Sequence, residues 1–165
     1  MTKYNKYTKY KTIDIKQRDW ANNSLDKCPI WCSVDLRDGN QALAEPMDSA
    51  RKMKFFKKLI DVGYKEIEVG FPSASDTDFN FIRELINDGH IPDDVTIQVL
   101  TQSREELIIK TIDSLKGSKN AIIHLYNSTS TLQRKVVFKE DMNGVKKIAT
   151  DGAKIISDNI GILNN

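Results

Sequence analysis

The chain has few cysteines and few histidines. Its 165 residues include two of each, Cys28 and Cys32, and His90 and His124. Both cysteines lie in the segment CPIWC, and no further Cys or His follows at the spacing of a zinc site. We therefore expect two reduced thiols rather than a zinc site.

Long apolar runs are also absent, and the N-terminus lacks the apolar core of a signal peptide. We therefore expect a cytoplasmic protein with no membrane partner. The 25 Lys and Arg nearly balance the 23 Asp and Glu, which leaves a net charge of +2. A balance this close argues against a nucleic-acid protein. At 39% hydrophobic, the chain has enough apolar side chains to bury the core of one domain.

Residues 1–27 are expected to form an N-terminal arm. Basic and aromatic residues are interleaved in it: Lys3, Tyr4, Lys6, Tyr7, Lys9, Tyr10 and Lys11. Such a mixture can stack on bases and contact phosphates. A solvated arm lying along the domain is the interpretation we favour, because no RNA-binding motif follows, and we expect no nucleic-acid partner.

Beyond the arm, strand patterns alternate with helix patterns. Short β-rich runs begin near Ile30, Lys65, Val95 and Ala121, and a helical pattern follows each of them. This alternation predicts an α/β fold with a parallel sheet. The helices are expected from Asp48 or Ser49 to Gly63, from Ser75 or Asp76 to just before Gly89, from a capping box at Ser103 and Glu106 to Gly117, and from Met142 to Ser157.

The expected strands carry polar groups on one face and apolar groups on the other. Ile67 and Val69 alternate with Glu66 and Glu68, and the next two runs alternate in the same way. Strands buried in a doubly wound sheet would be apolar on both faces. The pattern therefore favours a barrel, with its apolar strand faces against helices and its polar faces lining a common interior.

In a parallel α/β fold the functional site forms at the carboxyl ends of the strands. Those ends are Leu36 to Gln41, Glu68 to Pro72, Leu100 to Thr101 and His124 to Asn127, and they should meet in one cleft. Arg37 and Asp38 can both face that cleft only if the chain turns between them, which Gly39 permits. The alternatives are a surface ion pair for Arg37 and Asp38 and a core histidine for His124.

At this point four segments resemble a known family. CSVDLRDGNQAL, KEIEVGFPSASDTDFNFIRELI, IPDDVTIQVLTQSREELI and HLYNSTSTLQRKVVF look like the long-type 2-isopropylmalate synthases. Those proteins are metal-dependent (β/α)8 enzymes, related to homocitrate and citramalate synthases and to hydroxymethylglutaryl-CoA lyase. The likeness runs from about Tyr4 to about Ser157. Asn40 in LRDGNQ and Val69 in EVGFP resemble the isopropylmalate branch rather than the homocitrate or citramalate branch, which remain the related-substrate alternatives.

The resemblance implies condensation of acetyl-CoA with 3-methyl-2-oxobutanoate, a step of leucine biosynthesis, with a divalent cation (Mg, Mn or Zn) as cofactor. It makes Asp38 a metal ligand, and it makes Glu68 a residue that supports the metal without binding it directly. It makes Arg37 the group that stabilises negative charge on the reacting oxygen. These assignments are chemically consistent, because a hard cation prefers oxygen ligands and a guanidinium suits an oxyanion.

The remaining site residues follow from the same resemblance. His124 and Tyr126 would line the substrate pocket and act with Arg37 in catalysis. Gln41 would position the 2-oxo acid and Leu100 would touch its isopropyl group, so that Gln41, Leu100 and Glu68 form the substrate-binding set.

The chain departs from the family where further site residues are expected. The H-x-H metal motif, the general-base carboxylate and the C-terminal regulatory domain of these enzymes have no counterpart in the sequence. We therefore expect an arm at 1–27, the first (β/α)4 half of a TIM barrel at 28–158, and a non-homologous tail at 159–165. The chain alone should be inactive, either a homo-oligomer or missing its C-terminal half. The alternatives are one half of a split enzyme and a non-catalytic interaction protein.

Overall fold

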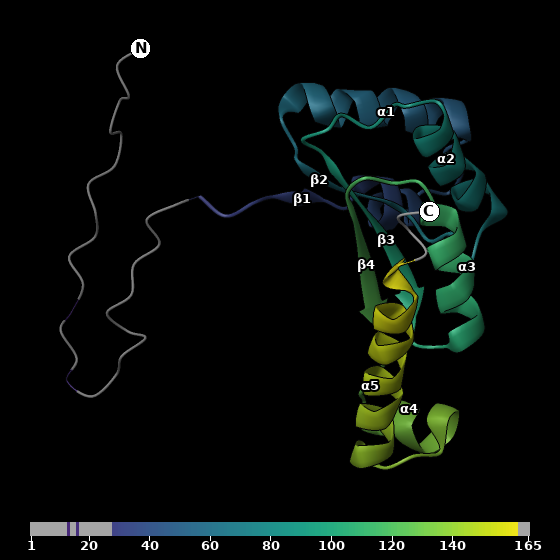
Figure 1. Ribbon diagram of the computed structural model, residues 1–165. Coiled ribbons are helices and arrows are strands. Elements are labelled where there is room, and N and C mark those ends of the chain that lie inside the picture. The colour runs from purple at the N-terminus through teal and green to yellow at the C-terminus, as the bar shows by residue number, and fades with distance from the viewer. Residues whose placement is uncertain (1–12, 14–15, 17–27, 162–165) are drawn as a thin grey trace.

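A computed structural model describes residues 13, 16 and 28–161, and its centre is one parallel sheet (Figure 1). The strands are β1 (Cys32–Ser33), β2 (Glu66–Gly70), β3 (Thr96–Gln102) and β4 (Ala121–Tyr126). All three pairings are parallel, in the order β1-β2-β3-β4. This is the strand order of a TIM barrel, and within the described residues the sheet stays open. The expected α/β fold with a partial barrel is confirmed.

Helices connect the strands and cover one face of the sheet. The long ones are α1 (Ser49–Val62), α2 (Asp76–Asn87), α3 (Glu105–Leu115) and α5 (Met142–Asn159). Each contacts the next, so that α1, α2 and α3 line the sheet and α5 lies beside β4 (Figure 1). The short helix α4 (Thr131–Gln133) and the π-helical turns η2 (Asp35–Gly39) and η3 (Arg134–Phe138) complete the described elements.

Three of the four predicted helix starts are confirmed, at Asp48, Ser75 and Met142, and one is wrong. The Asp48 carboxylate accepts from the Arg51 amide, and the Ser75 hydroxyl accepts from the amide of Asp78. The capping box predicted at Ser103 does not form, because Arg104 is the residue preceding α3 and makes no side-chain cap. The hydroxyl of Ser103 instead donates to the Ile148 carbonyl at 2.6 Å, which ties β3 to α5.

The core lies between the helices and the apolar strand faces. Ile67, Val69, Ile97 and Val99 are fully buried there, as the alternation predicts. Helix α2 contributes Phe81, Ile82 and Leu85 to this core. Phe81 is fully buried, whereas Phe79 is half-buried and lies beneath the Lys110 ammonium.

The first strand is much shorter than expected. A strand running from Ile30 to Leu36 was predicted, yet only Cys32 and Ser33 pair with β2. The chain then winds into η2, where the Gly39 amide donates to the Val34 carbonyl five residues back at 3.3 Å. The residues predicted to end a strand therefore form a single π-helical turn.

Both ends of the chain fall largely outside this description. Of the predicted arm at 1–27, only residues 13 and 16 are described, so its arrangement lies outside the described residues. Residues 162–165 of the predicted tail are also outside them. Within the described part, none of the helices has the length and apolarity needed to cross a bilayer.

Candidate functional site

The carboxyl ends of the strands form a cleft of about 450 Å³. Six of the seven predicted site residues line it, together with Phe71: Arg37, Asp38, Gln41, Leu100, His124 and Tyr126. The seventh, Glu68, lies beneath the cleft and is bonded to two of the others. The structure thus brings the predicted set together at one end of a parallel sheet.

A buried carboxylate organises this cleft. Glu68 on β2 is fully buried, and both of its oxygens bind Arg37, at 3.0 Å from Nε to Oε1 and 3.3 Å from Nη2 to Oε2. Such a two-pronged pair fixes the plane of the guanidinium and offsets the cost of burying the carboxylate. Glu68 therefore orients the guanidinium of Arg37 at the floor of the cleft.

Arg37 also binds its neighbour. Its Nη1 donates to the Asp38 carboxylate at 2.7 Å, and the Asp38 side chain is 64% exposed. Both residues face the cleft, as predicted, but the reason differs from the predicted turn at Gly39. They lie within the π-helical turn η2, so the turn of the chain spans Asp35 to Gly39 rather than Gly39 alone.

His124 approaches the same carboxylate from β4. Its Nδ1 lies 3.4 Å from Glu68 Oε1, and its side chain is 43% exposed. This exposure excludes the alternative of a core histidine. A proton on Nδ1 would face Glu68 and leave Nε2 as an acceptor toward the cleft.

Two aromatic rings also line the cleft. The Tyr126 hydroxyl accepts from Gln102 Nε2 at 2.9 Å, and its ring meets Phe71 edge to face, with centroids 6.3 Å apart. Leu100 is buried and lines the same cleft. The site therefore combines charged groups with aromatic and apolar side chains.

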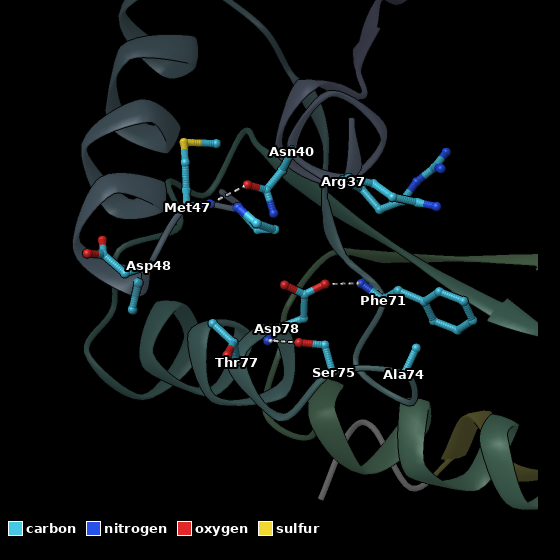
Figure 2. A pocket seen from close by; sticks show the side chains of 12 residues that line it. Arg37, Asn40, Met47, Asp48, Phe71, Ala74, Ser75, Thr77 and Asp78 are labelled. Atoms are coloured by element: carbon cyan, nitrogen blue, oxygen red, sulfur yellow. Dashed lines mark hydrogen bonds between the residues drawn. The ribbon is translucent and has the colours of Figure 1, made fainter. Parts of the chain in front are cut away.

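A second, larger cavity opens beside the cleft. It measures about 740 Å³ and lies between the loop that precedes α1 and the first turn of α2 (Figure 2). Arg37, Gln41 and Phe71 line both cavities, so the two adjoin each other. The loop is held by Asn40, whose side-chain oxygen accepts from the Met47 amide at 2.7 Å.

The larger cavity was not predicted from the sequence, although Phe71 was expected at the cleft as part of the strand end from Glu68 to Pro72. The available signal was the run of small residues after β2, Ser73-Ala74-Ser75, which leaves space above the first turn of α2. Side chains from distant segments close that space, and local spacing in the sequence does not predict which of them come together.

The two cysteines behave as expected. Both are free thiols, with Cys28 exposed and Cys32 half-buried on β1. Burial, together with the nearby carboxylates of Glu66 and Glu68, raises the pKa of the Cys32 thiol. A thiol with a raised pKa is a poor nucleophile and a poor metal ligand at neutral pH.

The described residues do not by themselves make up a metal site. None of their His, Cys, Asp and Glu side chains forms a group of three able to hold an ion. Asp38 offers one exposed carboxylate at the cleft, and it is already paired with Arg37. A cation bound here would need further ligands from outside the described residues.

Fold and site together define a class of protein. Parallel β/α units in sequential strand order, with charged side chains gathered at the carboxyl ends of the strands, are typical of TIM barrels. The sequence model of the HMGL-like family matches residues 28–161, and the chain belongs to that family.

Within that family the chain is similar to 2-isopropylmalate synthases. It is 59% identical over 153 residues to the 2-isopropylmalate synthase of Clostridium acetobutylicum and 60% identical over 150 residues to that of Pseudomonas savastanoi pv. phaseolicola. A third relative with the same name, from Mesorhizobium japonicum, is 58% identical over 153 residues. These matches cover 91 to 93% of this chain but only 27% of each relative.

Proposed function

We propose that this chain supplies the first part of the active site of a 2-isopropylmalate synthase, an acyltransferase of leucine biosynthesis. The reaction condenses acetyl-CoA with 3-methyl-2-oxobutanoate and releases 2-isopropylmalate and CoA. The observation that carries the proposal is the cluster of Arg37, Glu68 and His124 beside Asp38, at the parallel strand ends of an HMGL-like chain.

The reaction has two bond-forming steps. The acetyl methyl group loses a proton and attacks the keto carbon, whose oxygen becomes an alkoxide and then takes up a proton. Water then cleaves the thioester, giving the carboxylate and free CoA. The alkoxide needs a fixed positive donor, and Arg37 fits that need because Glu68 holds its guanidinium in one orientation. His124 and Tyr126 line the same cleft and are proposed to supply the proton that the alkoxide takes up.

The two adjoining cavities suit two substrates of unequal size. We place the small 2-oxo acid in the cleft, with Gln41 positioning its polar groups and Leu100 against its isopropyl group. The larger cavity, about 740 Å³, has room for the chain of the acyl thioester. Phe71 and Arg37 lie where the two substrates would meet.

Asp38 is proposed as one ligand of a divalent cation. Its carboxylate is exposed at the cleft, the kind of hard oxygen donor that Mg, Mn or Zn accept. A single carboxylate holds such an ion weakly, so residues 1–165 alone are expected to show no synthase turnover. The remaining ligands and the base that removes the methyl proton would come from a further segment, covalently joined or supplied as a second chain.

The test uses a hybrid enzyme, in which this chain replaces the matching 153 residues of the Clostridium acetobutylicum 2-isopropylmalate synthase. We expect turnover that requires both substrates, and loss of turnover in Asp38→Ala. The variant Arg37→Lys should lose about 100-fold in kcat, because a lysine cannot reproduce the planar fork. The matched control is Asp93→Ala, which removes a carboxylate from an exposed ion pair with Lys119.

Several outcomes would contradict the proposal. Turnover by the isolated chain that is lost in Asp38→Ala would show that the described residues suffice. Faster turnover of the hybrid with pyruvate or 2-oxoglutarate would favour a citramalate or homocitrate synthase. A hybrid that folds but stays inactive with all three 2-oxo acids would favour the non-catalytic interaction protein, for which the open edges of β1 and β4 would be the docking surface.

A further inference from the structure

A buried ion pair lies outside the cleft, under the larger cavity. Lys52 on α1 is fully buried, and its ammonium binds the Asp78 carboxylate on α2. The same ammonium lies 5.4 Å from the centroid of the Phe81 ring. A lysine this deep in an apolar core needs a partner, because an unpaired buried charge is strongly destabilising. The pair joins two helices that both begin at the rim of the cavity.

The second oxygen of Asp78 has a different partner. Oδ2 accepts a hydrogen bond from the Phe71 amide at 2.8 Å, and Figure 2 shows the carboxylate reaching the backbone just after β2. The preceding Gly70 has no room for a side chain, since a Cβ there would lie 2.9 Å from Asp78 Cγ. The carboxylate and the strand end are therefore in direct contact, and β2 loses its regular register between Glu68 and Gly70.

We propose that Asp78, itself fixed by Lys52, is a positioning residue that holds Phe71 at the junction of the two cavities and so shapes the acyl-thioester side of the site. Phe71 lines both cavities, whereas Ala74, Ser75 and Asp78 line only the larger one. A shift of this segment would deform the acyl-thioester cavity more than the 2-oxo acid cleft. The inference deepens the proposed function and rests on it for the identity of the substrate.

The test compares two double variants of the hybrid enzyme. Lys52→Met with Asp78→Asn removes both charges but keeps an acceptor for the Phe71 amide. In Lys52→Met with Asp78→Leu, the side chain at position 78 has nearly the same shape as asparagine but offers no acceptor for the Phe71 amide. Both avoid an unpaired buried charge, so both are expected to fold. The two variants differ in the acceptor for the Phe71 amide and in the polarity of one side chain that lines the larger cavity.

We expect the Leu variant to have a KM for acetyl-CoA about five-fold above that of the Asn variant, the equivalent of one lost hydrogen bond. Their KM values for the 2-oxo acid should agree within about two-fold, because Phe71 is the only residue of this segment that reaches the cleft. Equal KM values for acetyl-CoA, or equal increases for both substrates, would overturn the proposal.

A second readout is independent of catalysis. Hydrogen exchange at the Phe71 amide should be about ten-fold faster in the Leu variant than in the Asn variant, because an amide without its acceptor loses protection. Equal exchange would overturn the positioning role. If the unaltered hybrid fails to turn over while the exchange rates differ as expected, the proposed function is wrong but the positioning of Phe71 by Asp78 stands.

Discussion

The two inner strands and the two outer strands of the sheet have different surroundings. β2 and β3 are paired on both sides, and Ile67, Glu68 and Ile97 on them are fully buried. β1 has two residues, and every residue of β4 is half-buried or exposed. The cluster of Arg37, Glu68 and His124 joins the two kinds of strand. Glu68 lies on an inner strand, and Arg37 and His124 lie on outer elements. The inner strands thus fix the positions of groups that the outer elements bring to the cleft.

The largest expected effect concerns the outer strands. Within the described residues β1 and β4 each pair on one side only, which leaves backbone donors and acceptors open for another chain. We expect residues 1–165 alone to self-associate, with a symmetric dimer as the well-behaved outcome. Size-exclusion chromatography with light scattering over a dilution series measures this. A compact species that remains monomeric at high concentration would contradict it.

The next effect concerns the carboxylate of that cluster. Replacing Glu68 by Gln removes the buried carboxylate that binds Arg37 through two hydrogen bonds and leaves the guanidinium paired only with the exposed Asp38, and we expect about 3 kcal/mol of lost stability. His124→Ala removes the exposed outer partner and should cost less than about 1 kcal/mol. Urea unfolding of the hybrid enzyme compares the two. Equal losses would mean that inner and outer members of the cluster contribute alike.

A smaller effect distinguishes the strands by packing alone. Ile97→Val on β3 removes one methyl group from a fully buried site, with an expected loss of about 1 kcal/mol. Ile123→Val on β4 removes the same group where the side chain is only half-buried, so its effect should be about half as large. The shift in the midpoint of urea unfolding is the measurement, and a larger loss at Ile123 would reverse the comparison.

The smallest effect is chemical. Because burial and the carboxylates of Glu66 and Glu68 raise the pKa of Cys32, less of it is thiolate at any given pH. At pH 8 we expect Cys32 to be alkylated by iodoacetamide about three-fold or more slowly than the exposed Cys28, and its rate to keep rising at higher pH. Mass spectrometry follows both sites. Glu66→Gln should lower the Cys32 pKa and speed its reaction, while an unchanged pH profile would exclude the carboxylate contribution.

Much of the fold follows from local patterns in the sequence. The alternation of Ile67 and Val69 with Glu66 and Glu68 identifies both the buried and the site-facing side of β2. Asp48 and Gly63 mark the two ends of α1 because each satisfies backbone groups that the helix leaves unpaired. Parallel strand ends meet at one edge, and this geometry brings the predicted residues to one cleft.

The remaining features depend on contacts between distant segments. Val34 to Gly39 look like a strand and a turn, but the pairing that ends β1 at Ser33 is tertiary. Lys52 lies on the same helical face as Phe56 and Leu59, four and seven residues on, and this was a signal that it is buried. Its partner Asp78 is indistinguishable in sequence from an ordinary acidic residue in the first turn of a helix.

The π-helical turn at Asp35–Gly39 has a consequence for how the gene can change. The hydrogen bond of a π turn spans one residue more than that of an α turn. The π turn therefore resembles an α turn into which one residue has been inserted. Loss of a single codon there would let the turn relax into an α-helix and rotate the residues on one side of the deletion by about 100° relative to the other. Arg37 and Asp38, which both line the cleft, lie within the turn that would change. Substitutions can be sampled gradually at these five positions, but a change in their number would remove the site in one step.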